Sequence, residues 1–261
     1  MSINPIKIAI IDMYDDTSNL GMTCIVAIIN AWSKKNDIEM QYQIFPLRHK
    51  GEIPDHSFDI YLSTGGPGSP IDSVGSPWDN LYVKWLQDML SQQKPVLLIC
   101  HSFQIACRHF NFGNVCLRKS TQIGVLPVHP LVADPIFANL NDPFYTLESR
   151  LYQIIEPNDE NINALGAKII ALEKHRPHVP LERAIMAIKF SDTMYGVQFH
   201  PEGEKNILLE FFNEEKNKKN IIDKFGAEKW EVIISKLNDD EKLPKTHAHF
   251  IPNFLNLAIG N

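Results

Sequence analysis

The sequence predicts an α/β protein whose sheet is doubly wound and mostly parallel, with helices packed on both faces. Short apolar runs rich in β-branched residues alternate with longer segments in which apolar residues recur at helical spacing. Strands that alternate with helices in this way pair in parallel through crossover helices. A chain of 261 residues, of which 44% are hydrophobic, can bury the core of such a sheet.

The first half of the chain supplies most of the expected parallel strands. Apolar runs predict strands at residues 6–11, 39–45 and 58–62, and helical spacing predicts helices at 22–32 and 78–91. The aromatic residues of the second helix fall on its apolar stripe, so we assign them to the core rather than to a cofactor site. These units predict a three-layer, flavodoxin-like arrangement, in which ligands bind at the carboxyl ends of the strands.

The second half of the chain is less regular. Gly124 and Pro127 interrupt the stretch 115–128, which we therefore expect to form strands joined by a turn. Residues 184–190 and 195–199 flank a polar turn and predict a hairpin.

Three segments near the C-terminus have helical spacing, at residues 204–212, 221–237 and 250–259. We predict that residues 1–212 form one domain. Residues 213–261 are expected to form a C-terminal helical extension packed on the same domain.

Composition argues against several classes of partner. The net charge of −6 gives no basis for binding nucleic acid or an anionic membrane. Four cysteines are too few for a disulfide framework in a chain of this length and suit reduced thiols in the cytosol. The N-terminal residues lack a signal-peptide pattern, and no apolar run approaches the roughly 18 residues of a membrane span. We therefore expect a soluble, cytoplasmic protein.

The expected chemistry centres on the stretch 95–104, Pro-Val-Leu-Leu-Ile-Cys-His-Ser-Phe-Gln. Its apolar run predicts a buried strand that stops at Cys100, and a helix follows at once. A thiol on such a turn is exposed at the edge of the sheet, where the helix N-terminus favours the thiolate. The alternative is a structural cysteine, because free cysteines are often buried.

A glycine-rich loop, residues 63–70, follows the third expected strand. It lacks the Gly-x-x-x-x-Gly-Lys-Ser/Thr pattern of phosphate-binding loops. Because glycine lets backbone N–H groups approach a ligand closely, the loop is a candidate source of an oxyanion donor. The alternative is a plain surface turn.

His200 and Glu202 directly follow the second strand of the expected hairpin. The carboxyl ends of parallel strands share one edge, so both residues can lie beside Cys100. Histidine can take the thiol proton and later protonate a leaving group, and the nearby carboxylate can fix its tautomer. The backbone N–H of His101 and an N–H of the glycine-rich loop would face a developing oxyanion. The pattern predicts a Cys-His-Glu hydrolase.

Two histidine pairs are weaker candidates for metal binding. His175 and His178 lie in a basic loop whose cations disfavour a metal ion, and His247 and His249 have no third ligand beside them. We predict no metal site.

Three motifs resemble those of the class I glutamine amidotransferases, in the same order and spacing. They are Gly65-Gly66-Pro67, Cys100-x-x-x-Gln104 after a buried strand, and the most specific one, Gly196-Val197-Gln198-Phe199-His200-Pro201-Glu202. The resemblance covers roughly residues 6–212. The chain looks like a stand-alone protein similar to the amidotransferase domain of GMP synthetase.

The resemblance implies hydrolysis of the side-chain amide of L-glutamine through a γ-glutamyl thioester, with ammonia passed to a synthetase module or a separate synthetase subunit. No metal or organic cofactor is implied. By position, the resemblance assigns a role to each of six residues: Cys100 as nucleophile, His200 as base, Glu202 as orienting carboxylate, Gly66 and His101 as oxyanion donors, and Gln104 as a ligand of the substrate glutamine.

The chain departs from the family pattern Gly-x-Cys-x-Gly-x-Gln, because Leu98 and Ser102 stand in place of the two glycines. Those glycines relieve crowding between strand and helix, so we expect Leu98 to require a local rearrangement. Three hypotheses stay open. They are a glutamine amidotransferase or glutaminase, a hydrolase of other γ-glutamyl amides or peptides, and a non-catalytic module that binds a partner through the C-terminal extension.

Overall fold

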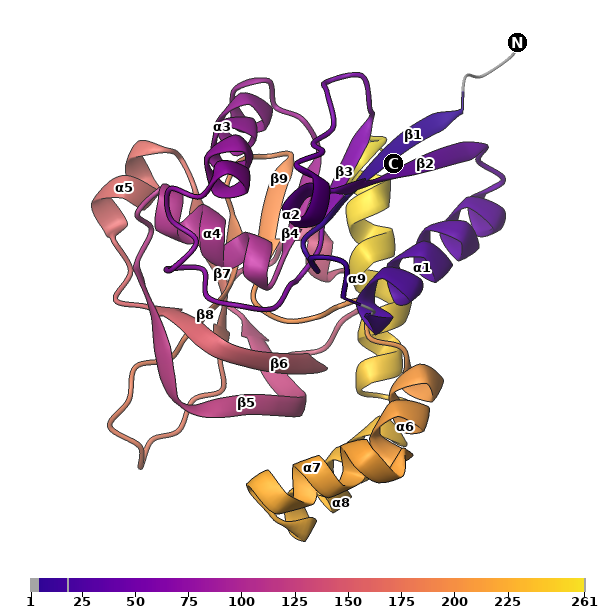
Figure 1. Ribbon diagram of the computed structural model, residues 1–261, viewed down its shortest axis with the longest axis vertical. Helices are drawn as coiled ribbons and strands as arrows, with labels where there is room; N and C mark the ends of the chain where they lie inside the picture. The colour runs from indigo at the N-terminus through magenta and orange to yellow at the C-terminus, as the bar shows by residue number, and fades with distance from the viewer. Residues whose placement is uncertain (1–4, 18, 261) are drawn as a thin grey trace.

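The computed structural model describes residues 5–17 and 19–260, and in this part of the chain the sheet has nine strands in the order β2-β1-β3-β4-β9-β8-β7-β5-β6 (Figure 1). The first five strands in that order run parallel to one another. Most of their residues are apolar and buried, as is usual for strands covered on both faces. Their bounds are Met40–Pro46 for β2, Ile6–Asp12 for β1, Ile60–Ser63 for β3, Val96–Ile99 for β4 and Met194–Val197 for β9.

The remaining four strands run antiparallel to their neighbours. The expected hairpin is formed by β8 and β9, and it joins the two halves because β9 also pairs in parallel with β4. The predicted α/β class is confirmed, with a mixed sheet. The antiparallel strands are β8 (Ile185–Lys189), β7 (Lys168–Glu173), β5 (Asn114–Pro130) and β6 (Phe144–Ile155).

Helices cover both faces of the parallel half of the sheet (Figure 1). Ile8 of β1 belongs to the core on one face and Ala9 to the core on the other, because successive side chains of a strand point to opposite faces. The first core includes α1 (Leu20–Asn36) and α9 (Leu243–Ala258), and the second includes α3 (Pro77–Ser91) and α4 (His101–His109). Short connections contain α2 (Leu47–Lys50), η1 (Pro135–Phe137) and α5 (Asp159–Ala164).

Three further helices pack on the antiparallel strands β5 and β6, at the lower end of the molecule in Figure 1. They are α6 (Lys205–Asn213), α7 (Glu215–Phe225) and α8 (Ala227–Leu237). A third core joins them to the sheet through Val125 of β5, which is buried against Leu208 and Ile233. These helices are therefore a packed part of the fold.

Two helix predictions were wrong in their bounds. The helix expected over 221–237 is broken at Gly226, whose φ of 88° lies in the region that glycine adopts without strain. The last helix begins at Leu243 rather than at residue 250. The division of the chain after residue 212 stays a prediction, and α6 runs across it.

The turn expected within 115–128 is absent from the structure of that segment, because Gly124 and Pro127 lie inside the single long strand β5. Gly124 has a φ of 113° and pairs with Glu148 of β6. A Cβ atom on Gly124 would lie 2.8 Å from Cγ1 of Ile233 in α8. The glycine therefore allows α8 to approach the strand, a requirement set by a residue far along the chain.

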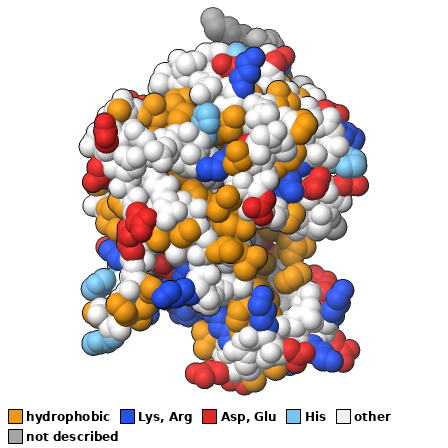
Figure 2. Space-filling view, turned by 60° about the vertical axis from the view of Figure 1, so that its left-hand side comes forward, with side chains coloured by type: hydrophobic (Ala, Val, Ile, Leu, Met, Phe, Trp, Pro, Cys, Tyr) orange, Lys and Arg blue, Asp and Glu red, His pale blue; other side chains and the backbone are white. Residues whose placement is uncertain are grey.

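The surface shows no separation of charge on the face drawn in Figure 2, where acidic and basic side chains are interspersed around a central group of hydrophobic ones. Within residues 5–17 and 19–260, no helix combines the length and the hydropathy that a membrane span requires.

Replacing Gly196 of β9 by alanine should destabilise the fold, because the added Cβ would lie 2.5 Å from Cδ2 of Phe103 and 2.8 Å from Cε2 of Phe190. We expect Gly196→Ala to lower the free energy of unfolding by about 1–3 kcal/mol in urea titrations. In a Phe103→Leu background the added penalty should shrink, since the ring that clashes has gone. Equal penalties in both backgrounds would contradict the assigned clash.

Candidate active site

Cys100 occupies a sharp turn between β4 and α4. Its φ of 49° and ψ of −97° are rarely adopted by a residue with a side chain. Two backbone hydrogen bonds hold the turn. The Cys100 N–H donates to Val197 O of β9 at 2.7 Å, and the Gln104 N–H donates to Cys100 O at 2.9 Å. The thiol side chain is 6% exposed and lines a cavity, so the predicted placement of a cysteine between strand and helix is observed.

Ser102 stands where the family pattern has a glycine, and its hydroxyl takes part in a buried chain of hydrogen bonds. The Tyr82 hydroxyl donates to Ser63 Oγ at 2.7 Å, and Ser63 Oγ lies 2.7 Å from Ser102 Oγ. Ser102 Oγ in turn donates to Thr64 O at 2.5 Å. These buried hydroxyls form one continuous chain that ties the first turn of α4 to the end of β3.

Leu98 is accommodated opposite a residue without a side chain. It is completely buried in β4 and pairs with Gly196 of β9. The space that a Gly196 side chain would fill is occupied by the rings of Phe103 and Phe190. Leu98 therefore packs in the core on the α3 and α4 side of the sheet.

His200 and Glu202 lie just beyond the end of β9. The His200 N–H donates to Leu147 O of β6 at 2.9 Å, which fixes the backbone. Nδ1 of the imidazole lies 2.8 Å from Glu202 Oε1, so Nδ1–H donates to the carboxylate and the other ring nitrogen, Nε2, is left for a second partner. Both side chains line the same cavity as Cys100.

The electrostatic surroundings of His200 favour its protonated form. Burial by itself would lower the pKa of His200. The Glu202 carboxylate and the Cys100 sulfur outweigh that effect and raise the pKa well above its ordinary value. The imidazole therefore lies between a carboxylate and a sulfur that both favour its charged form.

Gly65 and Gly66 place the glycine-rich loop against this group. A Cβ atom on Gly65 would lie 2.8 Å from Cε1 of His200 and 3.5 Å from Cβ of Cys100, so both side chains converge on that glycine. A Cβ atom on Gly66 would lie 2.3 Å from Met13 O, which leaves no room for a side chain. Gly66 also lines the cavity.

His101 is the first residue of α4, and its side chain is buried outside the cavity lining. Burial, followed by the guanidinium groups of Arg48 and Arg108, lowers the pKa of His101 to about 3, so the ring is neutral. Its backbone N–H precedes the first hydrogen bond of the helix, from Gln104 N–H to Cys100 O. Such an N–H has no acceptor within the helix and is available to a ligand.

Gln104 is buried behind Cys100 and does not line the cavity. Its Nε2 donates to Gln198 Oε1 at 3.2 Å, and Nε2 of Gln198 lies 3.7 Å from Cys100 Sγ. The structure therefore connects Gln104 to the thiol through Gln198. The role of Gln104 in holding substrate stays a prediction.

Two residues of this region take positions that the sequence did not predict: Tyr14 was not singled out, and His247 was considered only as a metal ligand. The hydroxyl of Tyr14 would lie 3.5 Å from a Cβ atom on Gly65, and Tyr14 lines the cavity. Burial, followed by Glu202 and Cys100, raises the pKa of Tyr14 far above its usual range, so its hydroxyl keeps its proton. On α9, Nδ1–H of His247 donates to Glu202 O at 3.0 Å.

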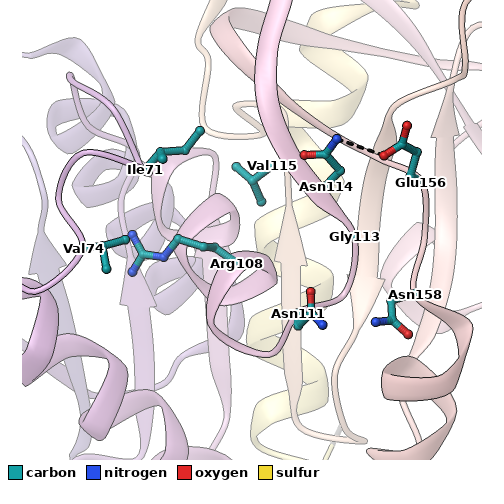
Figure 3. Close-up of a pocket in the computed structure, with 9 residues that line it drawn as sticks. All are labelled: Ile71, Val74, Arg108, Asn111, Gly113, Asn114, Val115, Glu156 and Asn158. Atoms are coloured by element: carbon teal, nitrogen blue, oxygen red, sulfur yellow. Dashed lines mark hydrogen bonds between the residues drawn. The ribbon is translucent and has the colours of Figure 1, made fainter.

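The cavity at this site has a volume of about 860 Å³. It extends from Cys100 and His200 across the start of α1 to β5, β6, α6 and α7. A second cavity, of about 530 Å³, lies beside Arg108 and Asn114 and holds none of the six predicted site residues (Figure 3). Among residues 5–17 and 19–260, no group of three or more His, Cys, Asp or Glu side chains is arranged to hold a metal ion.

Known proteins match this chain in fold, and one family model matches it in sequence. The family model for glutamine amidotransferase class-I matches residues 21–208. A glutamine amidotransferase from Thermotoga maritima superposes with a TM-score of 0.73 at 15% identity, over 99% of this chain and 100% of that one. A glutamine amido transferase from Methylobacillus flagellatus gives 0.61 at 17% identity, over 97% and 96%. A putative GMP synthase subunit from Thermoplasma acidophilum gives 0.54 at 18% identity, over 77% and 87%. No curated protein matches the chain in sequence.

Replacing Glu202 by glutamine should change the pH dependence of stability. Because the folded protein raises the pKa of His200, this group stabilises the fold fully below its unfolded pKa of about 6.5, and the contribution is lost as the pH rises through the folded pKa. Glu202→Gln removes the charge that contributes most to raising the pKa of His200. We therefore expect the stability difference between wild type and Glu202→Gln to be largest near pH 6 and to shrink at alkaline pH.

Urea titrations at several pH values measure this difference, and NMR titration of the imidazole Cε1–H reports the pKa itself. Glu215→Gln, an exposed change on α7, is the control and should leave both unchanged. A stability difference that grows with rising pH would contradict the assigned ion pair.

His247→Ala should weaken the positioning of Glu202, because it removes the Nδ1–H donor to the Glu202 carbonyl. The loss of one hydrogen bond, about 1 kcal/mol, predicts a roughly fivefold fall in any turnover that uses His200. His249→Ala, on the same helix, provides the comparison. If both variants lower turnover equally, the effect belongs to α9 in general and not to this contact.

Proposed function

Since this chain belongs to the class I glutamine amidotransferase family, we propose that it hydrolyses the side-chain amide of L-glutamine through a thioester on Cys100 and releases ammonia. The observation that carries the proposal is the convergence of Cys100 and His200 on Gly65, with Glu202 Oε1 2.8 Å from the far nitrogen of the imidazole. A nucleophile, a base and an orienting carboxylate are the parts that acyl transfer requires.

The proposed reaction has two halves. The Cys100 sulfur attacks the amide carbonyl as a thiolate, the C–N bond breaks, and the His200 imidazolium gives its proton to the departing ammonia. Water then attacks the thioester while His200 takes one of its protons, and glutamate leaves as the C–S bond breaks. Glu202 keeps the imidazole in the tautomer whose Nε2 faces the reacting atoms.

Oxyanion stabilisation is assigned to the backbone N–H groups of His101 and Gly66. The His101 N–H opens α4 without an intrahelical acceptor, and the helix N-terminus adds a partial positive charge. The fixed position of Gly66 against Met13 O supports the role of the Gly66 N–H as an oxyanion donor, because a preorganised donor costs no reorganisation during the reaction.

The packing around Cys100 favours an active enzyme over a non-catalytic module. Leu98 and Ser102 were the reasons to consider a non-catalytic module. The fold accommodates both side chains, and the thiol still lines the cavity. Members of this family often pair with a synthetase subunit that uses the ammonia. We propose such a synthetase partner for this chain as well.

Cys100→Ala should abolish glutamine hydrolysis, with a loss of about 10⁴-fold or more in kcat, because it removes the sulfur that forms the proposed thioester. Release of glutamate and ammonia from L-glutamine measures the activity. Cys116→Ala is the matched control, since Cys116 lies on β5 away from the cavity lining. A glutamine analogue that alkylates sulfur should label wild type and Cys116→Ala but not Cys100→Ala. Labelling that persists in Cys100→Ala would refute the assignment of the nucleophile.

A further inference from the structure

We infer that the site accepts, besides free glutamine, γ-glutamyl amides that carry an uncharged apolar group on the amide nitrogen. This inference rests on the proposed Cys100 chemistry and specifies its substrate class. It comes from the part of the cavity that lies beyond the reacting groups. That part is lined mainly by the side chains of Ile123, Leu147, Leu208, Phe211, Phe212 and Ile221.

The apolar wall is a fixed element of the structure. Leu208, Phe212 and Ile221 are buried in the third core, which joins α6 and α7 to β5 and β6. The junction of α6 and α7 is held by Asn217, whose Nδ2 donates to Phe211 O at 3.0 Å and to Glu214 Oε2 at 2.8 Å. A wall fixed in this way can select a substrate by shape.

The size of the cavity exceeds what the proposed reaction on glutamine requires. Its volume of about 860 Å³ is near the upper end of the roughly 300–1,000 Å³ typical of sites for drug-sized ligands. Free glutamine is a small amino acid whose leaving group is ammonia, and it would leave the apolar wall without a partner. An apolar substituent on the amide nitrogen would cover this wall and gain about 25 cal/mol for each Å² removed from water.

The charges around the cavity further narrow the class of substituent that the amide nitrogen can carry. Of the residues in the described ranges that line it, none is lysine or arginine, and the acidic one, Glu202, is bonded to His200. A substituent with its own carboxylate, as in a γ-glutamyl dipeptide, would enter an apolar space without a counter-ion. The substituent that fits is therefore neutral.

Half of the six residues that supply the wall lie outside the part of the chain that matches the family model. That match ends at residue 208, before Phe211, Phe212 and Ile221. The matched range thus holds all the proposed reacting groups, whereas the selecting surface is shared between β5 and β6 inside that range and α6 and α7 at and beyond its end. In the first half of the reaction, the C–N bond breaks and His200 protonates the departing apolar amine. Water completes the second half and releases glutamate.

The experiment compares L-glutamine, γ-L-glutamyl methylamide and γ-L-glutamyl isopentylamide, with glutamate release as the common readout. The two alkyl amides have similar intrinsic reactivity, so their ratio of kcat/KM reports contact with the apolar wall. We expect the isopentylamide to exceed the methylamide by about tenfold or more. γ-L-Glutamylglycine, which carries a carboxylate, should be the slowest of the substituted amides.

Phe211→Ala tests the wall itself, because this side chain lines the cavity and is 37% exposed, so its removal leaves the core intact. We expect it to reduce the isopentylamide-to-methylamide ratio about fivefold, and Phe211→Leu to restore most of it. Val232→Ala is the matched control, because Val232 on α8 is 41% exposed and does not line the cavity. Its ratio should equal that of wild type.

Failure of this inference can be told from failure of the proposed function. If Cys100 is labelled by the alkylating glutamine analogue but the ratio of the two amides is near one, the inference is overturned and the proposed function stands. A ratio that falls equally in Phe211→Ala and Val232→Ala also overturns it. If Cys100 is not labelled and no substrate is hydrolysed, both are overturned.

Discussion

The backbone conformation of Cys100 is the constraint on which the rest of the site depends. A φ of 49° in a residue with a side chain costs on the order of 1–3 kcal/mol, so the surroundings must hold it in place. Val197 O on one side and the first turn of α4 on the other do so through hydrogen bonds. The hydroxyl chain through Ser102 adds a tie to β3. Together they stop β4 at the point where the thiol meets the cavity.

The mixed sheet explains how the partner groups reach this thiol. Because β9 pairs in parallel with β4, the chain leaves both strands at the same edge, and His200 emerges beside Cys100. The antiparallel half of the sheet also positions His200, since the Leu147 carbonyl oxygen of β6 accepts a hydrogen bond from the His200 N–H. Cys100 and His200 therefore lie where the two halves of the sheet meet, and the C-terminal helices close the remaining side of the cavity.

Local patterns were sufficient to predict the parallel strands, the turn at Cys100 and the proximity of His200 and Glu202, because each depends on a few neighbouring residues and on one shared edge. Local patterns failed where the role of a residue depends on another residue far away in the sequence. Gly124 looked like a turn residue, although its function is to admit Ile233 of α8. Ser102 looked like a departure from a motif, although Ser63 and Thr64 require its hydroxyl. No spacing rule connects His247 to the carbonyl of Glu202.

The contact between His247 and Glu202 has a consequence for the order in which the site is assembled during synthesis. The ribosome makes Cys100 and Glu202 before α9, and α6 and α7 also follow the thiol. A nascent chain that has folded its parallel strands thus holds the Cys100 thiol without the contact between His247 and Glu202 and without the far wall of the cavity. The lining of the cavity is complete only after α6 and α7 have packed, and Glu202 gains its contact with His247 only after α9 has packed.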